Sequence, residues 1–123
     1  DFAKVAKENI EMSGLGDIVE VKIENVYEGI DERDLDLITL DLPRPDRVLH
    51  HAEVALKPGA FLTAFSTCIE QVKFLYEKLP QYRFRDYRTI ESLVRDLEVG
   101  RKCTRPSTRM IAHTGYLSFA RRV

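Results

Sequence analysis

The sequence predicts an α/β protein with a doubly wound, mostly parallel sheet and an antiparallel hairpin at its C-terminal edge. Helical and strand-like segments alternate through the first two thirds of the chain, as in strands joined by crossover helices. Two strand-like segments are almost wholly apolar, which is typical of parallel strands buried on both faces. The last third holds two long segments of apolar residues and arginines, which predict an antiparallel pair.

The N-terminal part contains one predicted helix and one predicted strand. Apolar residues recur at helical spacing over residues 1–13, and Gly14 stands where a C-cap glycine would. Residues 17–25 alternate apolar and charged side chains with the period of a half-buried strand. We expect this strand near a sheet edge.

The middle of the chain contains two predicted buried strands, each followed by a helix. Residues 35–42 and 60–66 are apolar runs of strand length. Residues 46–57 predict a helix after the first strand. Thr67 and Glu70 have the spacing of a capping box and predict the start of a second helix.

The remaining segments complete a single domain. Residues 82–99 and 110–121 predict the two antiparallel strands, separated by a loop over residues 100–108. A chain of 123 residues suits one domain with one core. It opens on a helix and contains no Gly-rich turn, so we expect it to be a piece of a longer domain. The absence of a long apolar run or a signal-like start makes a cytoplasmic location the expectation.

Charge is distributed unevenly along the chain. Residues 1–82 hold 9 Lys and Arg against 16 Asp and Glu, whereas residues 83–123 hold 10 against 4. A basic C-terminal third indicates a polyanionic partner, with a solvated Arg-rich face as the alternative. Cys68 and Cys103 are too few for a disulfide framework, although a pairing within or between chains stays open.

Asp41 is the strongest candidate for chemistry. Ligands of open α/β sheets bind outside the carboxyl ends of the strands, and Asp41 ends a strand that we expect to be central. The Leu42–Pro45 segment that follows contains two prolines, which cannot extend the ladder and leave carbonyls free. Asp46 is well placed to cap the next helix, which leaves Asp41 without a structural duty. A turn or cap role for Asp41 is the alternative.

No metal site is expected. His50 and His51 are neighbours on a predicted helix, where adjacent side chains point apart and cannot chelate one ion.

Three segments carry a family resemblance: DLPRP, LKPGAFLTAF and, most specifically, RPSTRMIAHTGYLSFARR. They resemble the archaeal tRNA (adenine-58) N1-methyltransferases over nearly all of the chain. The resemblance implies that residues 1–123 form the C-terminal part of a single Rossmann-like catalytic domain dependent on S-adenosylmethionine. It implies methyl transfer to N1 of adenine 58 in the tRNA T-loop, with adenine 57 as an open second target, and a homotetramer as the assembly.

The resemblance assigns Asp41 as the catalytic residue, beside the bound cofactor. Adenine N1 attacks a sulfonium methyl while the ring gains positive charge, and a carboxylate facing the N6 amino group can accept its hydrogen bond. The free carbonyls of Leu42 and Pro43 would take the second N6 hydrogen and select an amino base.

Further roles follow from the same resemblance. Asn25 would accept a hydrogen bond from the adenine amino group of the cofactor, and the backbone N–H of Val26 would face that ring, with an ordinary turn as the alternative for Asn25. The remaining residues expected to contact tRNA are Arg44, Arg105, Arg109, His113 and Thr114, with a simply hydrogen-bonded side chain as the alternative for His113.

Two other functions remain open at this point. One is a paralogue that binds tRNA without catalysing, against which the presence of Asp41 argues. The other is a different class I methyltransferase built on the same sheet.

Overall fold

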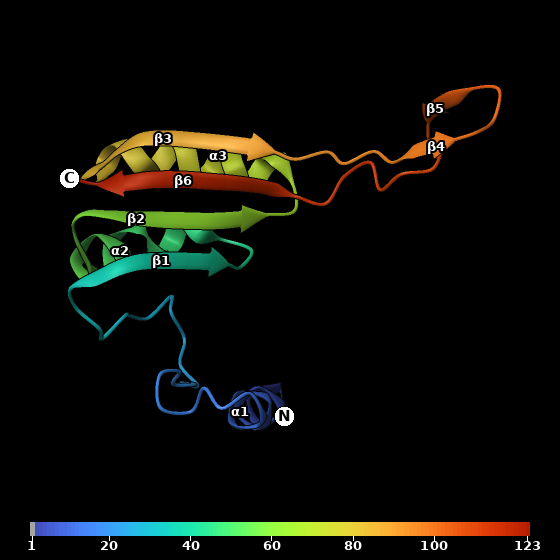
Figure 1. The fold of residues 1–123 in the computed structure, drawn as a ribbon. Helices are drawn as coiled ribbons and strands as arrows, with labels where there is room; N and C mark the ends of the chain where they lie inside the picture. The colour runs from blue at the N-terminus through green and yellow to red at the C-terminus, as the bar shows by residue number, and fades with distance from the viewer. Residues whose placement is uncertain (1) are drawn as a thin grey trace.

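A four-stranded mixed sheet, in the order β1-β2-β6-β3, organises the computed structural model, which describes residues 2–123 (Figure 1). The elements are α1 (Phe2–Met12), β1 (Leu35–Asp41), the 3₁₀ helix η1 (Pro45–Val48), α2 (Leu49–Ala55), β2 (Leu56–Ser66), α3 (Ile69–Lys78), the 3₁₀ helix η2 (Leu79–Gln81), β3 (Phe84–Glu91), β4 (Leu97–Val99), β5 (Thr104–Pro106) and β6 (Tyr116–Arg122). The α/β class predicted from the sequence is confirmed.

Strand directions follow the predicted plan. β1 and β2 are parallel, and β6 pairs antiparallel with both β2 and β3. Three of the four strands therefore share one direction, and the C-terminal antiparallel pair lies at one side of the sheet with β3 at its edge. The prediction that the strand ending at Asp41 is central is wrong for this sheet, because β1 forms the opposite edge.

The N-terminal helix forms as predicted, but the strand after it does not. Gly14 has a φ of 68°, and the N–H groups of Gly14 and Leu15 bond the carbonyls of Glu11 and Ile10, which is a Schellman C-cap. Asp1, included in the predicted helix, lies outside the described residues. Residues 17–25 contain no strand, because no other described strand pairs with them to complete a ladder.

Several predicted boundaries in the middle of the chain are displaced. The helix expected over 46–57 begins as η1 at Pro45, and α2 ends at Ala55. The following strand starts at Leu56 rather than residue 60. The capping box of α3 uses Gln71, whose side chain accepts from the Cys68 N–H, in place of the predicted Thr67 and Glu70.

The C-terminal strands are shorter than predicted. β3 and β6 pair only up to Glu91 and Tyr116. The segment between them, residues 92–115, leaves the sheet as an extended arm that carries the small β4–β5 hairpin (Figure 1). We call this segment the arm.

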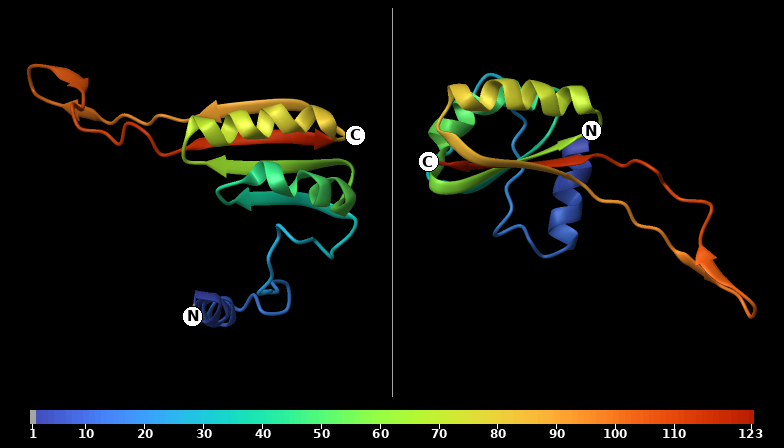
Figure 2. Two further views of the ribbon diagram at one scale, coloured as in Figure 1. Left: turned by 180° about the vertical axis from the view of Figure 1, so that it is seen from behind. Right: turned by 90° about the horizontal axis from the view of Figure 1, so that it is seen from above.

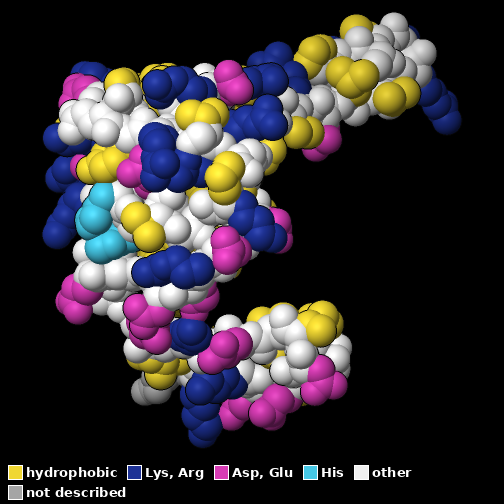
Figure 3. All heavy atoms as spheres, turned by 90° about the vertical axis from the view of Figure 1, so that its left-hand side faces the viewer, with side chains coloured by type: hydrophobic (Ala, Val, Ile, Leu, Met, Phe, Trp, Pro, Cys, Tyr) yellow, Lys and Arg dark blue, Asp and Glu magenta, His cyan; other side chains and the backbone are white. Residues whose placement is uncertain are grey.

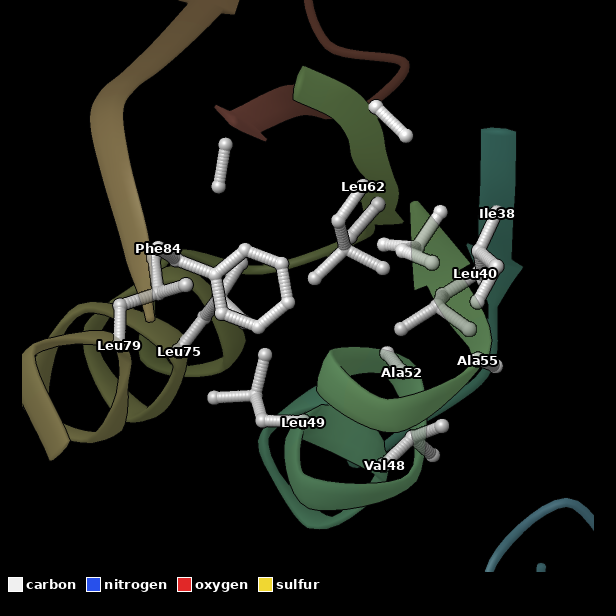
Figure 4. Packing of buried hydrophobic residues seen from close by; sticks show 14 residues of the cluster. Ile38, Leu40, Val48, Leu49, Ala52, Ala55, Leu62, Leu75, Leu79 and Phe84 are labelled. Atoms are coloured by element: carbon white, nitrogen blue, oxygen red, sulfur yellow. The ribbon is translucent and has the colours of Figure 1, made fainter. Parts of the chain in front are cut away.

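One hydrophobic core lies between the sheet and the helices on one of its faces. Figure 2 shows α2 and α3 on the same face of the sheet. Phe84, Leu49, Leu62 and Leu79 are the largest apolar side chains that are almost completely buried. Figure 4 shows them converging from β3, α2, β2 and η2. The core therefore fixes the sheet to both helices and holds the strand ends in place.

The other face of the sheet remains open in the described part of the chain. Leu37, Phe61 and Leu117 project from it and are about half exposed. No helix of residues 2–123 is long and apolar enough to cross a membrane.

Candidate functional site

The carboxyl ends of β1, β2 and β3 meet the start of β6 along one edge of the sheet. Asp41 pairs with Phe65, while Ser66 and Glu91 both pair with Tyr116. We call this the strand-end edge. The arm projects from the same side (Figure 1). Asp41 therefore lies at the carboxyl end of its strand, as the sequence predicted, and ligands of open α/β sheets bind beyond such ends.

Asp41 faces a small pocket at this edge. The pocket has a volume of about 160 Å³ and is lined by Asp41, Leu42, Pro43, Phe65, Thr67 and Gln71. Within residues 2–123 the Asp41 carboxylate makes no hydrogen bond or ion pair. It is exposed rather than buried, because it ends an edge strand. The carboxylate is therefore available to a ligand.

The Pro43 carbonyl is not free, contrary to the sequence prediction. Gln71 Nε2 donates a hydrogen bond to it across 3.2 Å. The two prolines do end the ladder as expected, but a side chain from α3 satisfies the carbonyl that they leave. Leu42 packs against the core.

Arg44 is engaged by a neighbouring carboxylate. Its Nε and Nη2 donate to the two Asp46 oxygens at 2.8 and 2.7 Å, and its guanidinium lies 4.7 Å from the Phe74 ring centroid. The bond to Arg44 holds the pKa of buried Asp46 below its usual range. Asp46 therefore does not cap the helix, contrary to the sequence prediction. The Asp46 carboxylate therefore balances much of the positive charge of Arg44.

Asn25 makes a turn near the same segment. Its Oδ1 accepts from the Tyr27 N–H at 3.2 Å, and its Nδ2 donates to Glu28 at 2.7 Å. Val26 and Tyr27 pack against the core, and the Tyr27 hydroxyl accepts from the Arg44 N–H at 3.2 Å. The structure thus joins the predicted cofactor segment to the chain after Asp41. Asn25 itself lines an open hollow of about 460 Å³.

His113 lies between the ends of β2 and β3 at the strand-end edge. Its Nδ1 lies 2.9 Å from a Glu91 oxygen and its Nε2 2.9 Å from the Thr67 carbonyl oxygen. Two acceptors suit the doubly protonated ring, and the hydrogen bond to Glu91, with that to Thr67, raises the pKa of His113. His113 ties the base of the arm to the chain after β2. Thr114 is exposed beside it.

Arg105 and Arg109 lie on the arm, apart from the pocket. Arg105 is on β5 and pairs with Glu98 at 3.6 Å, and Arg109 is exposed beyond it. Figure 3 shows Lys and Arg side chains over the part of the molecule formed by β3 and β6, and Asp and Glu side chains on the N-terminal part. The uneven distribution of charge along the sequence is therefore also seen on the surface of the molecule.

Sequence patterns did not identify Gln71, Tyr27 and Glu91 as residues of the candidate site. Gln71 stands three residues after Cys68 and has the spacing of a capping box, which was the available signal. Tyr27 and Glu91 act through contacts distant in sequence and carry no local signal.

The described residues form neither a metal-binding cluster nor a disulfide bond. Residues 2–123 contain no group of three or more His, Cys, Asp or Glu arranged to hold a metal ion. The His50 and His51 rings do not point apart as expected, since their centroids are 3.5 Å apart. Cys68 and Cys103 are exposed free cysteines.

Solved structures of methyltransferases share this fold. The SAM-dependent O-methyltransferase of Thermotoga maritima matches with a TM-score of 0.90 and 35% identity, over 99% of this chain and 46% of its own. The tRNA (m1A58) methyltransferase TrmI of Aquifex aeolicus matches with a TM-score of 0.81 and 26% identity, over 99% of this chain and 49% of its own. The fold is that of the Rossmann-like methyltransferases.

The family follows from the sequence comparisons. The family described as tRNA methyltransferase complex GCD14 subunit matches residues 1–103, and the chain belongs to it. The tRNA (adenine(57)-N(1)/adenine(58)-N(1))-methyltransferase TrmI of Methanocaldococcus jannaschii is 47% identical over 110 residues, which are 88% of this chain and 38% of that protein. The family resemblance seen in the sequence is confirmed. The chain spans less than half the length of these relatives.

Proposed function

We propose that the protein containing this chain transfers a methyl group from S-adenosylmethionine to N1 of an adenine in tRNA, with adenine 58 as the target and adenine 57 as a second candidate. One observation carries the proposal. In a chain 47% identical to an archaeal enzyme of this activity, Asp41 stands uncompensated at the strand-end edge. On this proposal residues 1–123 are the C-terminal part of one catalytic domain.

The chemistry assigned to Asp41 follows from its position. S-adenosylmethionine supplies an electrophilic methyl group, which adenine N1 attacks with its ring lone pair while the bond to sulfur breaks. The adenine gains a positive charge, shared with its N6 amino group. Asp41 accepts a hydrogen bond from that amino group and stabilises the charge as it develops. Leu42 and Pro43 line the same pocket and would border the base.

Asn25 and Val26 are proposed to hold the adenine of the cofactor, with Asp41 beside it. Asn25 fits this role if its side-chain oxygen can accept a second hydrogen bond besides the one that forms its turn. An amide oxygen has two acceptor positions, and Tyr27 uses one of them. The residues present therefore fit an adenine amino group.

The arm supports two further proposals about partners. Arg105, Arg109 and Thr114 would contact tRNA phosphates, and His113 would position them at the base of the arm. Exposed apolar residues of the arm would contact other copies of the chain in a homotetramer: Leu93, Val94, Leu97, Val99 and Ile111. Light scattering on the full-length protein, with and without residues 97–106, tests the assembly. A cytoplasmic location stays a prediction.

The activity itself is tested on the full-length protein with S-adenosylmethionine and transcribed tRNA. We expect N1-methyladenosine in digests analysed by mass spectrometry, less of it when adenine 58 is replaced by guanine, and none when adenine 57 is replaced as well. Product that persists on that substituted tRNA, with adenine 57 also replaced, would contradict the assigned target.

A second function has one observation in its favour, since the Thermotoga maritima neighbour is named an O-methyltransferase. The same assay separates the two, because an O-methyltransferase would leave adenine N1 unmodified. A paralogue that only binds tRNA would retain affinity for tRNA and form no product.

A further inference from the structure

A continuous series of hydrogen bonds crosses the strand-end edge. Glu91 bonds the His113 ring, and the ring bonds the Thr67 carbonyl. The N–H groups of Thr67 and Cys68 donate to Gln71 Oε1 at 2.8 and 3.4 Å. Gln71 Nε2 then donates to the Pro43 carbonyl. The series therefore connects the end of β3 with the segment after Asp41.

We infer that Gln71 is a positioning residue that fixes the Leu42–Pro43 segment beside Asp41 for the reaction. The inference rests on the proposed function. It gives Gln71 a duty beyond the start of α3, because the two ends of its amide do different things. The amide oxygen accepts N–H groups at the start of α3. The amide nitrogen donates to the Pro43 carbonyl beside the Asp41 pocket.

The backbone of the segment after β1 makes few other hydrogen bonds, although Leu42 packs against the core and Pro45 is buried. Pro43 and Pro45 have no N–H, so the backbone there cannot be held by a ladder. The Tyr27 hydroxyl binds the Arg44 N–H from one side. Gln71 binds the Pro43 carbonyl from α3, and both Gln71 and Pro43 line the Asp41 pocket. Removing the Gln71 donor leaves that carbonyl without its side-chain partner.

Helix capping alone does not require glutamine at this position. Glutamate is equally suited to the third position of a capping box, since a carboxylate oxygen accepts the same N–H groups. It cannot donate to the Pro43 carbonyl, and its oxygen would repel that group. The substitution Gln71→Glu therefore separates the two duties of the side chain.

The experiment compares Gln71→Glu with wild type in the full-length protein. We expect kcat for tRNA methylation to fall about ten-fold, because small displacements of a reacting group are costly. The dissociation constant for S-adenosylmethionine and the melting temperature should stay close to those of wild type. Gln81→Glu is the control, because Gln81 is an exposed glutamine whose side chain likewise donates to a carbonyl, that of Glu77, away from the pocket.

Hydrogen exchange supplies a readout that does not depend on activity. Peptides covering residues 40–48 should exchange faster in Gln71→Glu, while peptides from the start of α3 should not change. Wild-type exchange in those peptides overturns the inference even if the proposed activity is absent. Faster exchange with an unchanged kcat overturns it as well, whereas failure of wild type to methylate tRNA counts against the proposed function alone.

Discussion

The sheet with α2 and α3 differs sharply from the two segments outside it, residues 2–25 and the arm. The sheet and the outer segments are all rich in apolar side chains. Phe84 in the sheet is nevertheless fully buried, whereas Phe2 is 96% exposed and Val99 in the arm is 82% exposed. No residue of α1 is buried. An apolar pattern therefore indicates which face of an element can be buried, but burial depends on a partner surface.

Within the N-terminal segment, α1 and residues 17–25 differ in what they can form alone. α1 closes its hydrogen bonds within its own turns and ends in a regular C-cap. Residues 17–25 have a strand pattern but need a neighbouring strand, and none is present in the described chain.

The largest expected effect contrasts the core with the arm. Phe84→Ala removes a ring packed against Leu49, Leu62 and Leu79, and we expect it to lower the free energy of unfolding by about 3–5 kcal/mol. Arg101→Ala, at an exposed position of the arm, should change it by less than about 0.5 kcal/mol. Denaturant unfolding of the full-length protein measures both. Similar losses from the two variants would mean that the arm is buried in the assembled protein.

A smaller loss is expected where the arm rejoins the sheet. A Cβ on Gly115 would lie 2.3 Å from the Phe65 ring and 2.9 Å from the Ser66 carbonyl oxygen. The ring can move but the backbone oxygen resists, so Gly115→Ala should destabilise the protein by about 1–3 kcal/mol. Gly29→Ala is the control, because nothing lies within 4 Å of a Cβ there. Equal melting temperatures for the two variants would contradict this close approach.

Ser66 should show an effect of opposite sign. Its hydroxyl is buried at the end of β2 and has no hydrogen-bond partner among the described residues. Ser66→Ala removes an unsatisfied polar group and should raise the free energy of unfolding by about 1 kcal/mol. A lower melting temperature would instead indicate that Ser66 binds a group supplied from outside the chain.

The smallest effect concerns the joint between arm and sheet. The bond to Glu91 raises the pKa of His113, so the protonated ring stabilises the folded state below its unfolded pKa of about 6.5. This stabilisation is lost as the pH rises through the higher folded pKa. The difference in melting temperature between wild type and His113→Gln should therefore shrink as the pH rises above 6.5. A difference that is constant with pH would contradict the contact.

The sequence predicted the parts that depend on local pattern. The apolar runs of β1 and β2, the helix cap at Gly14 and the placement of Asp41 at a strand end all follow from residue order. The partners of Asp46 and Pro43 could not be predicted in the same way. Arg44 competes with the helix cap for the Asp46 carboxylate, and Gln71 reaches the Pro43 carbonyl from 28 residues away.

The central claim is that Asp41 acts in methyl transfer. Single-turnover methylation of tRNA by the full-length Asp41→Asn variant tests it most directly, together with calorimetric titration of S-adenosylmethionine. Asparagine keeps the size of the side chain but removes the charge that stabilises the adenine cation. We expect a rate about 100-fold or more below wild type, with little change in cofactor affinity. A wild-type rate would contradict the account.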